Sequence, residues 1–194
     1  MNNKNYNNDF VEWIYSIIYK RYMDDKKTYE DFESFMILNL YLITINFDVN
    51  KIINRYKEDG KIYATAEYEM RQFKNLYNMV CRSVLGRNYH KIPAEKKPLS
   101  VVCVDADGSR YWKEMGDLKN IHLHSIWLMD SEMKGGFDKI REKSLSMNNA
   151  FDIKSIDVKR YNGDIKKIIS YIFKFDKFNI ENLDIYKSFE IYPK

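Results

Sequence analysis

The chain has 194 residues, of which 45% are hydrophobic and 15% aromatic, and its net charge is +4. This length predicts one domain with peripheral additions, and the aromatic content excludes an intrinsically disordered chain. Cys81 and Cys103 lie in apolar segments without metal-type spacing, so we expect buried, reduced thiols in a cytoplasmic protein. The polar start of the chain lacks the apolar core of a secretory signal, and no apolar run reaches membrane-spanning length, so no membrane partner is expected.

The N-terminal part predicts a tail followed by helices. Residues 1–8 are polar and are expected to be disordered. From Phe10 onward the apolar residues follow helical spacing, and a capping-box pattern begins at Asp9. Thr28 is a candidate N-terminal cap for a second helix that runs towards Ile37.

The rest of the chain predicts an α+β fold with a mostly antiparallel sheet flanked by helices. Strands are expected where β-branched and aromatic residues run together or alternate, at 40–47, 99–104, 121–129 and 151–161. Helices are expected at 67–85 with Gly86 as the C-terminal cap, after the break at Gly135 and Gly136 to about Leu145, and from the Asp164 cap to about Phe175. Residues 48–60 are a connection with room for a short helix, and the tail to Lys194 either adds a strand or packs on the surface.

Two of the three histidines, His122 and His124, share one predicted strand. Residues two apart in a strand point to the same face, so Leu123 points to the opposite face, into a core. Two neighbouring imidazoles on a rigid backbone can bind a divalent metal ion. The alternative is a pair of polar residues on an exposed strand face.

A carboxylate is the expected third metal ligand. Val101, Cys103 and Asp105 share one face of the preceding strand, so Asp105 approaches the imidazoles if the two strands pair. A carboxylate with two imidazoles suits Mg²⁺ or Mn²⁺ acting on phosphate oxygens. Asp107 is the second choice, and acids beside Asp-Gly also form simple turns.

The last predicted helix separates an apolar stripe of isoleucines from a stripe that carries Lys167, Tyr171 and Lys174. Positive charge one turn away on either side of Tyr171 favours the phenolate and attracts a phosphodiester. The alternative is an ordinary amphipathic tyrosine beside solvated lysines. Basic residues near 87–97 and 154–167 are candidates for contacts with a nucleic-acid backbone.

The order of these pieces resembles the HUH endonuclease superfamily, and more narrowly its single-tyrosine rolling-circle replication initiators (Rep proteins). The family's threonine-containing apolar strand matches Leu42–Phe47, its histidine pair matches His122–His124, and its tyrosine motif matches Tyr171–Lys174. The segment Phe73–Arg87 resembles the helix between the first two motifs.

The resemblance divides the chain into three parts. These are a tail and helical extension at 1–37, an HUH endonuclease domain with an RRM-like sheet at 38–176, and a C-terminal tail at 177–194.

The resemblance also implies a mechanism. His122, His124 and Asp105 would hold Mg²⁺ or Mn²⁺, Tyr171 would attack the scissile phosphate and become linked to the DNA 5′-phosphate, and Lys174 would neutralise charge. The substrate would be single-stranded or hairpin origin DNA. The sequence contains no GxxxxGK motif, so we expect unwinding by a host or other helicase. Monomer and dimer both remain open.

The chain departs from the family pattern in two respects. The family's acidic ligand is usually a glutamate, whereas this chain offers Asp105 and Asp107. A second nucleophilic tyrosine is not evident, and the nearest candidate, Tyr161, precedes the turn.

Three other interpretations remain. A transposase of the same superfamily would typically carry glutamine where Lys174 stands. A DNA-binding module would bind DNA without forming a covalent adduct. A structural protein would bind neither DNA nor metal.

Overall fold

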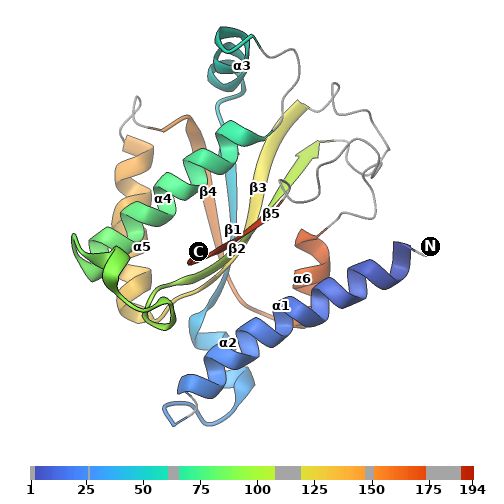
Figure 1. Ribbon diagram of the computed structural model, residues 1–194, viewed down its shortest axis with the longest axis vertical. Helices are drawn as coiled ribbons and strands as arrows, with labels where there is room; N and C mark the ends of the chain where they lie inside the picture. The colour runs from blue at the N-terminus through green and yellow to red at the C-terminus, as the bar shows by residue number, and fades with distance from the viewer. Residues whose placement is uncertain (1–2, 26, 61–65, 108–118, 147–150, 174–188) are drawn as a thin grey trace.

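The computed structural model describes residues 3–25, 27–60, 66–107, 119–146, 151–173 and 189–194. Within these ranges, a five-stranded antiparallel sheet with strand order β4-β1-β3-β2-β5 carries helices on both faces (Figure 1). The strands are β1 (Leu40–Phe47), β2 (Leu99–Asp107), β3 (Lys119–Leu128), β4 (Ile153–Arg160) and β5 (Phe189–Tyr192). The helices are α1 (Asn3–Asp25), α2 (Phe32–Asn39), α3 (Val49–Glu58), α4 (Glu67–Leu85), α5 (Ser131–Ser146) and α6 (Ile165–Ile172), with two short 3-10 turns, η1 (Tyr89–Lys91) and η2 (Ala94–Lys96). The predicted α+β class is confirmed.

The sheet separates two apolar cores because alternate side chains of each strand point to opposite faces. Helices α4 and α5 bury one face, where Phe73 and Phe137 pack against Trp127 of β3. Helices α1, α2 and α6 bury the other, where Ile14 and Ile169 share a core with the sheet. The helices of the predicted N-terminal extension therefore pack directly onto the sheet.

The structure corrects the predicted starts of the first two helices. Helix α1 begins at Asn3, so most of the tail expected at 1–8 is helical. The sequence pattern misses these turns because the apolar spacing starts only at Phe10. Helix α2 begins after Asp31, whose carboxylate accepts a hydrogen bond from the Ser34 amide at 2.7 Å, and not after Thr28.

The predicted chain break at Gly135 and Gly136 is wrong, because α5 begins at Ser131 and runs through both glycines. Its first turn is held by Asp130, whose carboxylate accepts a hydrogen bond from the Met133 amide at 2.8 Å. A Cβ atom at Gly136 would lie 2.3 Å from Cγ2 of Val84 in α4, whereas a Cβ at Gly135 would meet nothing within 4 Å. Gly136 is thus explained by close helix packing rather than by a turn.

Other predicted boundaries are confirmed. β1 and α4 have the expected bounds, Gly86 adopts a positive φ of 80° at the end of α4, and the Asp164 side chain caps α6. Helix α6 ends at Ile172, three residues before the predicted end, and β2 continues to Asp107. The C-terminal segment adds β5, which pairs with β2.

We expect Gly136→Ala to lower the free energy of unfolding by about 1 to 3 kcal/mol, because the added methyl overpacks against a β-branched side chain with little rotameric freedom. The matched change Gly135→Ala should raise it by roughly 0.5 to 1 kcal/mol through helix propensity. Urea denaturation of both variants measures the two effects. Equal effects at the two positions would contradict the close α4–α5 contact.

Candidate metal centre

The pairing of β2 and β3 places two histidines and an acid in neighbouring rows of one sheet face. Asp105 is the direct cross-strand partner of His122, while His124 lies between Thr44 of β1 and Cys103 of β2. Because the side-chain period of a strand is two, His122, His124 and Asp105 all point towards the face covered by α1, α2 and α6.

The side chains of this triad, Asp105, His122 and His124, converge on one point. Oδ2 of Asp105 lies 3.5 Å from Nε2 of His122 and 3.2 Å from Nε2 of His124. The side chain of His122 is 16% exposed, that of His124 7% and that of Asp105 4%. The alternative of two polar residues on an exposed strand face is therefore wrong.

The triad fits a divalent metal ion. One ligand atom from each residue lies within 4.8 Å of the others. Neighbouring donors of an octahedral ion with ligand distances of about 2.1 Å are about 3 Å apart, close to the observed separations. One carboxylate oxygen and two imidazole nitrogens form a mixed set that accepts Mn²⁺ and Mg²⁺ among other divalent ions. The residues present thus fit a metal ion.

Thr44 orients one of these ligands. Its Oγ1 lies 3.0 Å from Nδ1 of His124. For Nε2 to offer its lone pair to a metal, Nδ1 must carry the proton and donate it to the Thr44 hydroxyl oxygen. The Thr44 hydroxyl can accept this hydrogen bond, and the contact orients the His124 ring with Nε2 towards Asp105.

Cys103 is the cross-strand partner of His124 and lies beside the triad without joining it. The residue is fully buried, and this burial raises the pKa of its thiol, with the nearby Asp105 carboxylate adding to the shift. A protonated thiol is a poor metal ligand, so the nitrogen and oxygen donors define the site.

Helix α6 brings Tyr171 to the triad. The helix buries Ile165, Ile169 and Ile172 on the same sheet face, which leaves Tyr171 on its outer side with 45% of its surface exposed. The centroid of the Tyr171 ring lies 5.3 Å from that of His124. An accessible phenol thus lies beside a candidate metal ligand, and the two rings are in direct contact.

The remaining predicted site residues are placed differently. Lys167 is 85% exposed and pairs with Asp164 at 3.8 Å. Lys174 lies outside the described residues. Asp107 follows a register shift in β2, so the alternation through Asp105 does not extend to it. Tyr161 is buried, its hydroxyl donates to the Gly163 carbonyl, and burial raises its pKa to about 12.

Comparisons with protein-family models, with curated proteins and with solved structures gave no match. Within the part of the chain that the structure describes, no helix has both the length and the apolar character to cross a membrane.

We expect Thr44→Val to weaken Mn²⁺ binding by about 10-fold or more, because loss of the hydroxyl releases the His124 tautomer and ring orientation. Thr44→Ser, which keeps the hydroxyl, should bind nearly as well as the wild type. Isothermal titration calorimetry with Mn²⁺ gives both affinities. Equal weakening in the two variants would mean that the methyl group, not the hydrogen bond, matters.

We expect Asp105→Asn to reduce Mn²⁺ affinity more than Asp107→Asn, because the Asp105 carboxylate approaches both imidazoles. Calorimetry under identical conditions ranks the two variants, and thermal melts check that both remain folded. The opposite ranking would show that the carboxylate ligand comes from Asp107.

Proposed function

We propose that this protein is a metal-dependent endonuclease that nicks single-stranded DNA through a covalent tyrosine intermediate, as the resemblance to HUH replication initiators implies. The observation that carries the proposal is the contact between Tyr171 and His124 of the triad. A nucleophile has to lie beside the group that activates the scissile phosphate, and the sheet and α6 bring these two side chains together from distant parts of the sequence.

The triad has the donors that such chemistry requires. When bound, Mg²⁺ or Mn²⁺ supplies a Lewis acid for a non-bridging phosphate oxygen. His122 and His124 offer neutral nitrogens, and Asp105 offers the single charged oxygen. This set would leave excess positive charge at the metal position, which suits an anionic phosphodiester substrate.

Tyr171 would carry the covalent step. Its hydroxyl loses a proton to solvent, and its oxygen forms a bond to phosphorus while the bond from phosphorus to the 3′-oxygen breaks. The leaving oxygen takes up a proton and becomes a free 3′-hydroxyl, and the 5′-phosphate stays attached to Tyr171. The phosphotyrosine ester conserves the bond, so attack by a 3′-hydroxyl would rejoin the strand without ATP.

Accessibility supports a polymeric substrate. Tyr171 is nearly half exposed and His122 is partly exposed, while His124 and Asp105 are buried. Tyr171 and His122 are thus accessible to solvent above the buried His124 and Asp105, so the backbone of a flexible single strand can reach them. A duplex presents its phosphates on a stiffer helix, so we propose single-stranded or hairpin DNA as the substrate.

We expect Tyr171→Phe to abolish the covalent protein–DNA adduct while leaving Mn²⁺ affinity nearly unchanged, because only the attacking oxygen is removed. Incubation with a pool of short single-stranded DNAs and Mn²⁺, followed by a denaturing gel, measures the adduct. Tyr19→Phe is the matched control, because Tyr19 on α1 has a similar exposure of 42%. Adduct that survives in Tyr171→Phe would assign the nucleophile elsewhere, and DNA binding by the wild type without any adduct would favour a non-catalytic binding module.

A further inference from the structure

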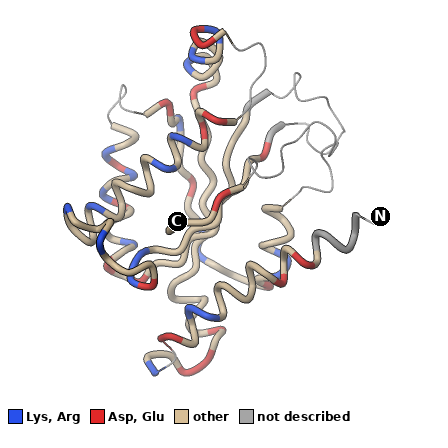
Figure 2. Tube along the Cα trace, viewed as in Figure 1, with Lys and Arg blue, Asp and Glu red and all other residues tan. Residues whose placement is uncertain are grey.

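The connection between α4 and β2 gathers unpaired positive charge. The segment Arg82–Lys97, which is the last turn of α4 and most of the connection after it, is called here the basic loop. It holds five lysines and arginines and a single acid, Glu95. Four of the five cations are exposed, and Figure 2 shows them along the connection. The cations are Arg82, Arg87, Lys91, Lys96 and Lys97. None of them forms an ion pair with another residue that the structure describes.

The other basic segment, at 154–167, is different. Of its described lysines, Lys159 pairs with Asp157, Lys166 with Glu12 at 2.6 Å, and Lys167 with Asp164. Charge at that segment is therefore partly neutralised within the protein. In the described part of the chain, no acid pairs with a cation of the basic loop, which leaves these charges accessible to a partner.

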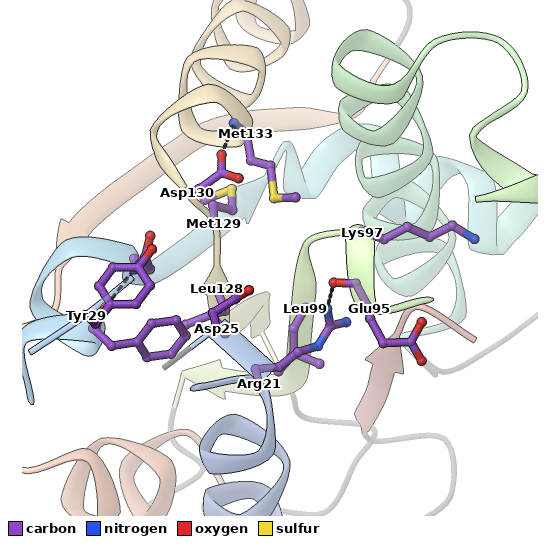
Figure 3. A pocket seen from close by; sticks show the side chains of 12 residues that line it. Arg21, Asp25, Tyr29, Glu95, Lys97, Leu99, Leu128, Met129, Asp130 and Met133 are labelled. Atoms are coloured by element: carbon purple, nitrogen blue, oxygen red, sulfur yellow. Dashed lines mark hydrogen bonds between the residues drawn. The ribbon is translucent and has the colours of Figure 1, made fainter. Parts of the chain in front are cut away.

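The basic loop is held in a fixed shape. Hydrogen bonds between backbone groups close η1 and η2, including Lys91 N to Asn88 O at 2.9 Å. From below, the guanidinium of Arg21 on α1 donates to the carbonyls of Ala94, at 2.7 Å, and Glu95 (Figure 3). The Tyr77 hydroxyl donates to the Pro98 carbonyl at 2.9 Å. A fixed backbone loses less conformational entropy when a polyanion binds.

The basic loop and the triad lie at opposite ends of β2. The loop leads into Leu99, and Asp105 is six residue steps further along the strand. At about 3.3 Å per residue this separation is roughly 20 Å, which several nucleotides of a single strand can span. In Figure 1 the connection lies at the lower left and the end of β2 at the upper right.

We infer that the basic loop is a second DNA-binding surface, which holds backbone phosphates of the segment flanking the nucleotide at Tyr171. The inference rests on the proposed function in naming DNA as the polyanion. Lysine and arginine contacts of this kind are independent of sequence and fix the position of the strand, whereas the triad and Tyr171 act on one phosphate. The loop would thus secure the DNA on either side of a break.

The test compares Arg87→Ala/Lys91→Ala/Lys96→Ala with a control of equal charge change, Lys57→Ala/Lys139→Ala/Lys143→Ala, whose residues are exposed on α3 and α5. Fluorescence anisotropy with random-sequence single-stranded DNA, in chelator and over a range of salt, measures binding without the metal site. For a strand of about 30 nucleotides, the loop variant should show a slope of log affinity against log salt that is shallower by about 2, at about 0.7 per lost contact. The control should match the wild type, and both variants should bind Mn²⁺ as the wild type does.

Two outcomes would overturn the inference. One is an equal slope for the loop variant and the control. The other is absence of DNA binding by the wild type even at low salt, which would favour an acidic protein as the partner. Failure of the proposed function gives a different result. If the basic loop binds DNA but no adduct forms at Tyr171, the second DNA-binding surface is supported and only the nuclease activity is contradicted.

Discussion

The register between β1, β3 and β2 is the constraint on which the site depends. It aligns Thr44 with His124, and His122 with Asp105, on one face of the sheet. Leu123 and Trp127 fill the core on the opposite face, and a slip of one residue would exchange the two faces. Such a slip would expose two large apolar side chains, and burial of each one stabilises the fold by about 1.5 to 3 kcal/mol. The core on one face therefore fixes the positions of the metal-binding side chains on the other.

Helix α6 depends on its neighbours for its position. A helix of eight residues is too short to be stable alone, so packing must hold it. Helix α1 supplies part of that packing, through the Phe10 ring 5.1 Å from that of Phe173 and through the ion pair of Glu12 with Lys166. The N-terminal helix therefore acts on Tyr171 through α6, although it contributes no residue to the triad.

Local patterns in the sequence predicted the parts of the fold that depend on neighbouring residues. A run of β-branched and aromatic residues predicted β1, the strand period of two predicted the shared face of His122 and His124, and helical spacing predicted α4. The role of Thr44 depends on its hydrogen bond to His124, which lies 80 positions further along the chain. No local sequence pattern predicts that contact. The glycine pair in α5 predicts a chain break for the same reason. The actual cause of Gly136 is its close contact with Val84 in another helix, which no local pattern shows.

Strand β5 links the end of the chain to the metal centre. It pairs with β2 along Ser100–Cys103, and Phe189 is the cross-strand partner of Cys103, directly beside the row of His124. Without β5, β2 would become an edge strand with unpaired backbone groups, open to fraying or to pairing with another molecule. Removing residues 189–194 would thus disturb the strand that carries Asp105.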